Sequence, residues 1–452
     1  MSVGRRAIEA DAGIGFIDSY LLGNTGSMCV WLRDLFIEDG HGLYYLAFAL
    51  YSAWSWLNRT TIWSIESMPA ISIVENMIQL SILALLAISF LKQRATRGEW
   101  ALALLTLCVG FAVWQISDEG WFFWIIIFVV CGKGVRLLPL AVITLVTVLS
   151  VTVLSASLSC LGVIEDKIMV RGSNGFVRHA MGFGHPNFFG AALLVISISF
   201  AAVCWRKIIV APVMAALISA YLAAAVADSR ATSLCLIVLS VLLPITVFAD
   251  KNDKVRECAY LLLLLFILMV AVSVYFTFFF DPSRASNLFL DRLLSGRLRL
   301  ANTYYESGGL TALGYSYPDG PMYWAEGKEY NFVVDNLYAH ILLRYGLIAF
   351  LLFVIAMILL FVKAIRSGTS GVLLFGLGMF LIYGLSETLG CRVECNFFIV
   401  GLWTVLYRCP VGQFDGSAAR VDTCGENSSN REELSFGDCI KSVCRFRGLS
   451  ND

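Results

Sequence analysis

The segment LLPLAVITLVTVLSVTVLSASLSCL, residues 137–161, decides the fold class because it contains no Asp, Glu, Lys, Arg or His. A membrane crossing takes roughly 20 consecutive apolar residues, so this segment is long enough for one. The composition agrees: 58% of the 452 residues are hydrophobic and 15% are charged, against about 25% charged in soluble domains. Further apolar runs occupy 42–57, 71–91, 100–116, 187–205, 209–227, 231–249, 258–280, 336–362 and 371–390. We therefore expect an all-α integral membrane protein.

Two further apolar runs, 121–131 and 397–407, are too short to be judged by length alone. The basic residues help, because cytoplasmic loops carry an excess of Lys and Arg. If both runs cross and the N-terminus is cytoplasmic, 21 of the 33 Lys and Arg residues lie inside and 11 lie outside. If 121–131 did not cross, every later basic loop would face outward. The sequence thus predicts about 12 transmembrane helices with both ends in the cytoplasm.

The expected organisation is one helical membrane domain, 42–407, between a cytoplasmic N-terminal segment, 1–41, and a cytoplasmic tail, 408–452. The tail is rich in Ser, Gly and charge, so we expect it to be disordered. No apolar stretch begins the chain, and no cleavable signal peptide is expected. Two outer loops are long, 162–186 and 281–335, and long loops in compact proteins are usually functional.

Charge and motif content exclude several kinds of protein. The net charge is zero, so nothing attracts the chain as a whole to nucleic acid. Asp-x-Asp, a phosphate-binding Gly-rich loop ending in Lys-Ser/Thr, and His-Glu-x-x-His are all missing from the sequence. The 13 Cys residues form no Cys-x-x-Cys pair, and we interpret them as small buried side chains. We expect chemistry that needs no metal, cofactor or nucleic-acid partner.

Several outer basic residues stand beside predicted helix starts. Arg178 and His185 precede Pro186, and Pro is favoured in the first turn of a helix. Asp228-Ser229-Arg230 repeats the pattern, with Asp or Ser as the cap and Arg230 in the first turn. A helix N-terminus together with Arg is a ready anion site. The alternative is that these arginines reach lipid headgroups.

The long outer loop combines an amphipathic stretch with aromatic residues. Residues 287–306 can form a surface helix with Leu288, Leu290, Leu293 and Leu294 towards the membrane. Tyr304, Tyr315 and Trp324 belong to an aromatic-rich stretch whose rings could stack on sugars or form an interfacial belt.

The loop returns to the membrane through Asp335-Asn336-Leu337-Tyr338-Ala339-His340. Asp335 and His340 are titratable groups at the start of the tenth predicted span. Arg344 lies deeper and needs a protein partner or a water-filled cleft. We expect an ion pair with Glu75 or Glu387 as the structural alternative.

Taken in order, these motifs resemble the O-antigen polymerases and ligases and the related capsular and exopolysaccharide polymerases. The resemblance covers roughly residues 171–400. Its motifs are Arg178 with His185-Pro186-Asn187, Ser229-Arg230, Ser295-Gly296-Arg297, Gly308, Gly314-Tyr315, Asp335-Asn336-x-Tyr338 and Tyr345-Gly346. Ligases of the family place His where this chain has Asp335, and that difference favours a polymerase.

The resemblance implies a GT-C-like glycosyltransferase of the bacterial cytoplasmic (inner) membrane with an outward-facing site. Its substrates would be undecaprenyl-diphosphate-linked oligosaccharides, among membrane lipids, with a flippase and a chain-length regulator of the same pathway as partners. Asp335, ranked ahead of His340, would be the general base, and Arg297 would also act in catalysis. The diphosphate would contact Arg178, Arg230, Arg297 and His185, and the glycan would contact Tyr304, Tyr315, Trp324, Asn336 and Tyr338.

Three alternatives remain open. A ligase would pass the glycan to lipid A core or to peptidoglycan. A flippase or solute transporter would also have about 12 helices, but carriers place charges and broken helices at mid-membrane. An assembly role without catalysis is the third. The predicted spans are nearly free of charge, which favours the enzyme.

Overall fold

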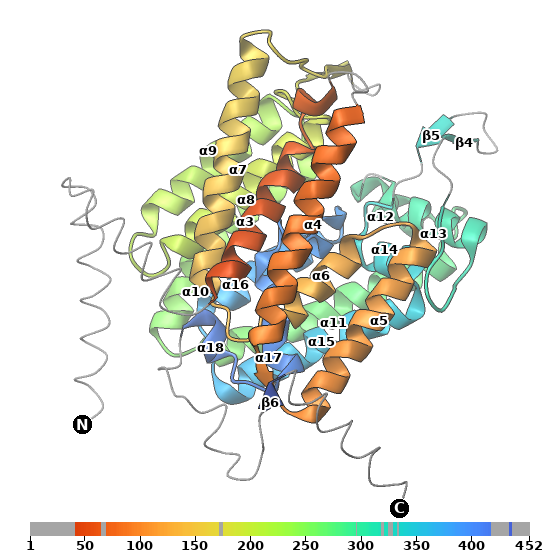
Figure 1. Ribbon diagram of the computed structural model, residues 1–452. Helices are drawn as coiled ribbons and strands as arrows, with labels where there is room; N and C mark the ends of the chain where they lie inside the picture. Colours follow the sequence, from red (N-terminus) through yellow and green to blue (C-terminus); the bar gives the residue numbers. More distant parts are fainter. Residues whose placement is uncertain are drawn as a thin grey trace, which may run out of the picture.

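The computed structural model describes residues 41–64, 69–170, 175–294, 296–317, 321–323, 329–331, 334–416 and 434–435. Most of the predicted terminal segments 1–41 and 408–452, together with Trp324, lie outside these residues. The described chain is a mostly helical bundle (Figure 1).

The helices of the first two thirds of the chain follow the predicted apolar runs one for one. They are α3 (Gly42–Leu57), α4 (Pro69–Lys92), α5 (Arg97–Ser117), α6 (Trp121–Val130), α7 (Leu137–Cys160), α8 (Pro186–Val203), α9 (Val210–Ala225), α10 (Arg230–Lys251) and α11 (Val255–Phe279). Thr96 caps α5 in a reciprocal capping box with Glu99, and Pro186 occupies the first turn of α8 as predicted.

The rest of the chain is more broken. Its helices are α12 (Ala285–Leu293), α13 (Arg297–Gly308), α14 (Leu337–Arg344), α15 (Gly346–Ser367), α16 (Gly371–Tyr383), α17 (Trp403–Leu406) and α18 (Gly412–Asp415), with 3-10 turns η2 (Thr61–Ser64), η3 (Thr388–Cys391) and η4 (Phe397–Leu402). Three antiparallel strand pairs add to them: β1 (Arg94–Ala95) with β6 (Leu434–Ser435), β2 (Met169–Val170) with β3 (Val177–Arg178), and β4 (Pro321–Tyr323) with β5 (Glu329–Asn331).

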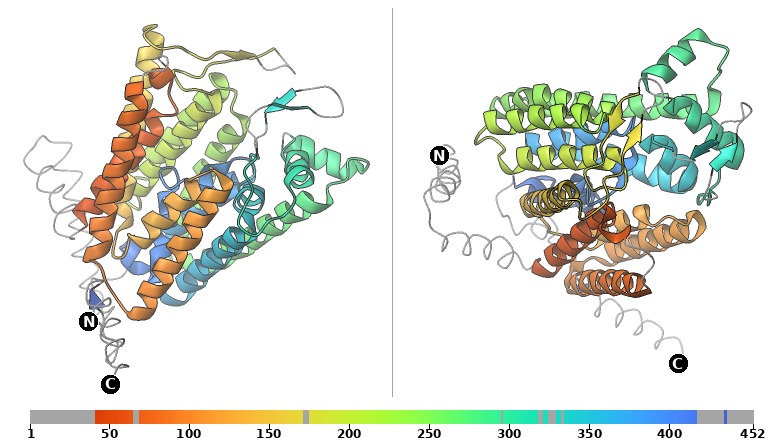
Figure 2. Two further views of the ribbon diagram at one scale, coloured as in Figure 1. Left: turned by 45° about the vertical axis from the view of Figure 1, so that its right-hand side comes forward. Right: turned by 90° about the horizontal axis from the view of Figure 1, so that it is seen from above.

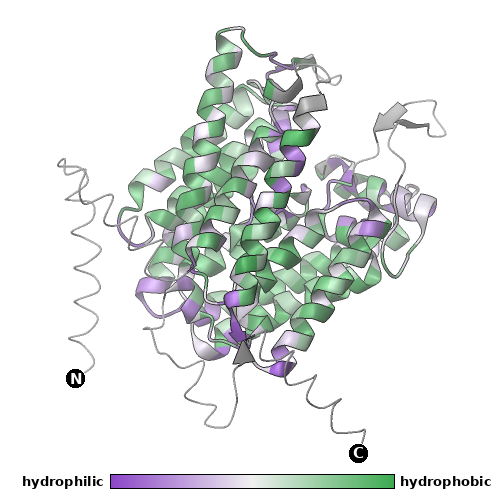
Figure 3. Ribbon diagram, viewed as in Figure 1, coloured by the Kyte–Doolittle hydropathy of each residue, from purple (hydrophilic) through white to green (hydrophobic). Residues whose placement is uncertain are grey.

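Seven of the described helices are long and apolar enough to cross a membrane, judged by length and composition: α4, α5, α7, α8, α10, α11 and α15. Four shorter apolar helical segments lie at α6, α9, α16 and Phe397–Leu406. Hydrophobic residues fill the middle of the helices, and hydrophilic residues gather at the lower turns in Figure 3. This pattern is that of a multi-pass membrane protein.

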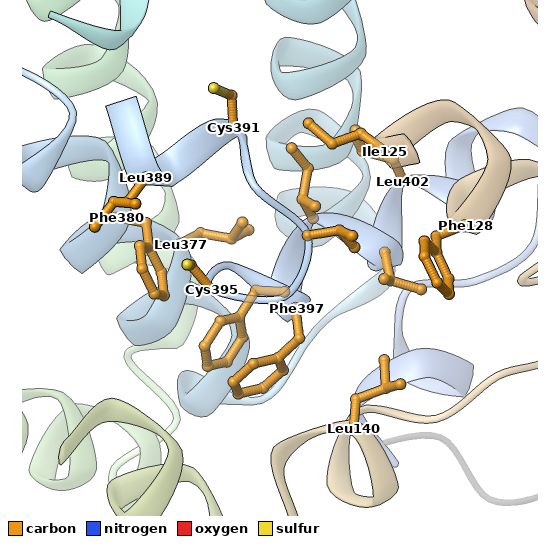
Figure 4. Close-up of a cluster of buried hydrophobic side chains, with 14 of the residues drawn as sticks. Ile125, Phe128, Leu140, Leu377, Phe380, Leu389, Cys391, Cys395, Phe397 and Leu402 are labelled. Atoms are coloured by element: carbon orange, nitrogen blue, oxygen red, sulfur yellow. The ribbon is translucent and has the colours of Figure 1, made fainter. Parts of the chain in front are cut away.

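The C-terminal segments lie at the centre of the bundle. Seen from above in Figure 2, the segments coloured blue lie between α8–α10 on one side and α3–α4 on the other. Nearly every side chain of α16 and every side chain of η4 is buried. A helix that is apolar on all sides is stable where protein or lipid covers every face. Phe380, Phe397, Cys391 and Cys395 belong to this core (Figure 4).

The cysteines only partly follow the sequence-based interpretation. Cys235, Cys391 and Cys395 are buried and free, as expected of small core side chains. Cys108 and Cys160 are exposed on apolar helices, so for these two the interpretation as buried side chains is wrong. Both lie on helix faces that carry other exposed apolar side chains, Leu105 beside Cys108 and Val153 beside Cys160.

The predicted tenth span, 336–362, is broken into α14 and α15. The chain turns at Gly346, whose φ of +85° favours glycine. The loop around Gly314 packs into this break, and Tyr315 N donates to Arg344 O (3.1 Å). A Cβ on Gly346 would overlap the backbone N of Gly314, and a Cβ on Gly314 would overlap Arg344 O. The break therefore requires both glycines.

Two other helix boundaries predicted from the sequence were wrong. The single surface helix predicted at 287–306 is divided into α12 and α13 by a turn in which Gly296 has a φ of +86°. Leu290 and Leu294 pack against a cluster formed by Phe276, Phe280 and Leu298 instead of facing lipid alone. The predicted span 371–390 stops as a helix at Tyr383. The irregular segment after it holds Glu387, which takes part in the candidate site.

Candidate functional site

Arg297 lies between two carboxylates from distant parts of the chain. Its Nη2 is 3.6 Å from Asp335 Oδ2 and 3.2 Å from Glu387 Oε1, and its Nε donates to Ser386 O (2.5 Å). The Arg297 and Glu387 side chains are only 11% and 12% exposed. Three segments meet here: the start of α13, the residue pair before α14, and the segment after α16.

Arg178 reaches the same place from another side. Its Nη2 donates to Asn187 Oδ1 (2.6 Å), and Asn187 Nδ2 donates to Glu387 Oε1 (3.3 Å). Glu387 thus joins both arginines, one directly and one through an amide. We call Arg178, Asn187, Arg297, Asp335 and Glu387 the Glu387 cluster. Three of its members, Arg178, Arg297 and Asp335, are residues that the sequence analysis singled out.

Local structure fixes Arg178 and its neighbours. Arg178 ends β3, its Nε donates to Ala227 O (2.8 Å), and the next residue, His179, bonds through Nδ1 with Asp166 Oδ2 (2.7 Å). The other Asp166 oxygen accepts from the backbone N of Ala180 (2.9 Å). The Arg178 bond ties the loop to the turn before α10, and the Asp166 bonds hold two parts of the loop together.

His185 is the N-cap of α8 and accepts from Asn187 N through Nδ1 (3.0 Å). Burial lowers the pKa of His185, and the positive charge of Arg178 lowers that pKa further. The imidazole is therefore held neutral beside the cluster. Its role in the structure is to position Asn187, and it lies within the group predicted to bind an anion.

The two carboxylates on Arg297 affect each other's charge. Burial raises the pKa of Glu387, and the nearby Asp335 raises it further, so that it reaches about 8 despite Arg297. Burial also raises the pKa of Asp335, opposed by Arg297 and His340. With both acids ionised, the two arginines and two carboxylates cancel. With a proton on Glu387, the cluster has a net positive charge and can accept an anion.

A second charged group lies beside the first. Glu119, in the turn between α5 and α6, has its Oε2 at 2.9 Å from His340 Nε2 and at 3.5 Å from Arg344 Nε. The Trp121 ring stacks on the His340 ring at 5.8 Å, and Tyr345 meets it edge-on at 5.2 Å. Burial alone would raise the pKa of Glu119, but His340, Arg344 and Arg392 together lower it. The expectation that Arg344 pairs with Glu75 or Glu387 is therefore wrong.

Arg230 stands apart from the Glu387 cluster. It begins α10, its Nε is 3.4 Å from Asp228 Oδ1, and its side chain is 60% exposed. The Ala227 carbonyl that holds Arg178 belongs to the same turn. Arg230 thus follows the turn that contacts Arg178, but the structure pairs Arg230 with neither Arg178 nor Arg297.

Two residues predicted to contact glycan form hydrogen bonds within the protein. Asn336 caps α14, accepting from the backbone N of Tyr338 and Ala339 (both 3.0 Å) and donating to Ser273 Oγ (3.1 Å). Tyr338 is fully buried, and its OH donates to Leu381 O (2.9 Å). The polar atoms of both side chains bond within the protein, and their assignment to glycan binding stays a prediction.

The aromatic residues of the 281–335 loop differ in how exposed their rings are. The Tyr304 ring is buried 4.4 Å from that of Tyr317, in a small core with Leu343. Tyr315 is 39% exposed at the edge of that core. Trp324 lies outside the described residues. Of the three rings proposed to stack on sugars, Tyr315 is the described one with an open surface.

The structure contains a further buried ion pair that was not predicted from the sequence. Arg59, just after α3, pairs with Glu394, and Ser55 Oγ donates to the same carboxylate oxygen (2.9 Å). The Arg392 guanidinium lies 3.1 Å from the centre of the Trp121 ring. The only sequence signal for Arg59, Arg392, Glu394 and Glu119 was that each is a charge next to an apolar run.

The described residues contain no group of three or more His, Cys, Asp and Glu side chains placed to hold a metal ion. Compared with known protein families, curated proteins and solved structures, the chain has no match.

Proposed function

We propose that this chain is a membrane glycosyltransferase that polymerises polysaccharide repeat units carried on undecaprenyl diphosphate, at the outer leaflet of a bacterial cytoplasmic membrane. The observation that carries the proposal is the convergence of Arg178 and Arg297 on Glu387, beside Asp335. Two half-buried arginines at one place suit the doubly charged leaving group of such a donor. Their nearness to apolar helices suits its lipid.

The proposed topology has about 12 crossings. Seven long apolar helices would cross directly, and α3, α6, α9, α16 and the pair η4–α17 would complete the set. The turns at 118–120 and 384–387, and the loops that carry Arg178 and Arg297, would then share the outer face. Short helices such as α6 and α16 would cross with the help of neighbouring residues, since both are largely buried in protein.

The proposed reaction is a displacement at the anomeric carbon of the donor. The acceptor hydroxyl oxygen forms a bond to that carbon while the bond from carbon to phosphate oxygen breaks, and its electron pair leaves with undecaprenyl diphosphate. Negative charge grows on the diphosphate, where Arg178 and Arg297 would stabilise it. Arg230 and the amide end of α8 would add to the positive field. A base, Asp335 or His340, would accept the hydroxyl proton.

Incubating the purified protein in nanodiscs with a lipid-linked oligosaccharide as the sole glycan tests this proposal. We expect a ladder of polymer on undecaprenyl diphosphate, formed also in the presence of EDTA. Transfer to lipid A core without a ladder would instead assign a ligase. Movement of the intact donor across the bilayer, without a new glycosidic bond, would instead assign a carrier.

A further inference from the structure

The Glu119 carboxylate and the His340 imidazole form a hydrogen-bonded pair at the side of α14 (2.9 Å). We infer that His340 is the base that takes the acceptor proton and that Glu119 is its positioning residue. The inference rests on the proposed glycosyl transfer and assigns the base within it. Asp335 then belongs to the donor side, as a partner of Arg297.

The hydrogen bond fixes the form of the imidazole. A carboxylate only accepts hydrogen bonds, so His340 Nε2 carries the proton in the neutral ring. Nδ1 is then the atom with the free lone pair. Within the part of the chain that the structure describes, no group forms a hydrogen bond with His340 Nδ1. That atom is available to accept a proton from a substrate hydroxyl.

Glu119 is held in one position. Asp118 ends α5 in the left-handed conformation, and the Glu119 backbone N donates to Ser117 Oγ (3.4 Å). Arg344, one helical turn beyond His340, lies 3.5 Å from the same Glu119 oxygen. Arg392 adds a second positive charge nearby. These cations keep Glu119 ionised, so a proton taken up by His340 stays on the imidazole.

The two base candidates differ in how well their surroundings stabilise the base once it has accepted a proton. On His340 the product is an imidazolium, which Glu119 stabilises directly. On Asp335 the product is a neutral acid, which removes a charge that Arg297 favours. Asp335 also contacts the Arg297 guanidinium, which belongs to the proposed diphosphate site. His340 lies five residues further along, in the first turn of α14, so acceptor and donor sites can be neighbours without overlapping.

Aromatic rings confine the imidazole. Trp121 stacks on one face of His340, and the edge contact with Tyr345 limits rotation of the ring. A ring held in this way keeps Nδ1 directed at one point, which is what a positioned base requires. The α5–α6 turn therefore supplies both the carboxylate and the wall of the proposed acceptor site.

Kinetics of purified variants test the inference. We expect Glu119→Gln to lower kcat by about 10²- to 10⁴-fold, with KM for the donor within about twofold of the wild type. Glu119→Asp should retain part of the activity. Asp118→Asn, in the same turn but exposed and tolerated in a left-handed conformation, is the matched control and should remain near wild type.

Two further results separate positioning from a merely structural role. Because Glu119 acts through His340, the double variant Glu119→Gln/His340→Gln should be no slower than His340→Gln alone. The chain has four His residues, so ¹⁵N NMR of labelled imidazoles can follow His340, assigned by His340→Gln. We expect Nε2–H alone in the wild type, and a mixture of tautomers in Glu119→Gln or Glu119→Ala.

The outcomes are distinct. If polymer forms and His340→Gln is fully active, or if the His340 tautomer is unchanged in both Glu119 variants, the inference is wrong while the proposed function stands. If no glycan transfer occurs with any lipid-linked donor, the proposed function is wrong, and so is the assignment of His340 as its base. The tautomer measurement then reports only whether Glu119 orients the ring.

Discussion

Glu387 is the residue on which the account of the donor site depends most. It connects Arg178, through Asn187, with Arg297, and it faces Asp335, Arg392 and the buried Tyr383 and Cys235. An ionised Glu387 makes the cluster neutral and opposes a diphosphate. A protonated Glu387 leaves a positive site. Its protonation state should therefore be coupled to anion binding.

The pH dependence follows from the pKa of Glu387, raised to about 8 by burial and Asp335. Below pH 8 the acid is neutral and pyrophosphate binds a positive cluster. Above pH 8 the acid ionises, and affinity should fall as the pH rises. Calorimetric titration with pyrophosphate should show this decline in the wild type and a flat profile over the same range in Glu387→Gln. The same decline in both proteins would assign the titrating group elsewhere.

The arginines provide the second test at this scale. Hydrogen bonds to charged groups contribute about 1.5–3 kcal/mol, so Arg178→Ala and Arg297→Ala should each reduce turnover tenfold or more. Lys should rescue only in part because it lacks the planar fork. Arg230→Ala should have a smaller effect, since its side chain is 60% exposed and solvent screens it. Full-length polymer from all three Ala variants at normal expression would place the site elsewhere.

The residue types were predictable from the sequence, but their partners were not. Arg178 and Arg297 stood out as charges beside helix starts. Glu387 was named only as a possible partner of Arg344. Its contacts with Arg297 and Asn187 were missed, because 371–390 was expected to be one helix and nothing local marks the end of that helix at Tyr383. Asn336 and Tyr338 were taken for ligand contacts, because a sequence does not show that their polar atoms already bond to α11 and to Leu381.

At the scale of elements, the break between α14 and α15 is what turns Arg344 towards Glu119. The loop at 309–316 fills this break through bonds such as Leu347 N to Thr311 O (2.9 Å). Two glycines with positive φ meet there without room for a methyl group. The sequence contained both glycines, but only the fold shows that Gly314 and Gly346 meet.

Gly346→Ala and Gly314→Ala should therefore be costly. A left-handed backbone costs roughly 1–2 kcal/mol for a residue with a Cβ, and here the new methyl group would also overlap backbone atoms that cannot move aside. Gly162→Ala is the matched control, with a φ of +71° and nothing within 4 Å. We expect Gly346→Ala and Gly314→Ala to unfold in detergent at clearly lower temperature than Gly162→Ala. Equal melting temperatures in the three proteins would contradict the packing described.

For the whole molecule, the position of every apolar run was predictable, because burial in lipid and burial in protein both select apolar residues. Which of these helices face lipid was not predictable from the sequence. α16 is enclosed at the centre, whereas α4 and α11 leave most of their apolar surface exposed. Nothing in the composition of these helices separates the two cases. Tertiary contacts decide between them.

Topology is the prediction that belongs to this scale. Reporter fusions after Asp253 and after Gly368 should read as cytoplasmic, and a fusion at Gly309 should read as external, because basic residues concentrate in the cytoplasmic segments. Fluorescence and phosphatase reporters give complementary signals at each position. A cytoplasmic signal at Gly309 would reverse the side assigned to Arg178, Arg297 and Asp335.

The central claim is that the Glu387 cluster supports transfer of glycan from a lipid diphosphate. The most direct measurement is the rate of polymer formation by purified wild type, Arg297→Ala and Arg299→Ala on a lipid-linked oligosaccharide. Arg299 lies on the same helix with an exposed side chain, so it controls for the loss of a charge. The account predicts a polymer ladder from wild type and Arg299→Ala, and at least a tenfold slower reaction from Arg297→Ala. Equal rates from all three proteins would contradict it.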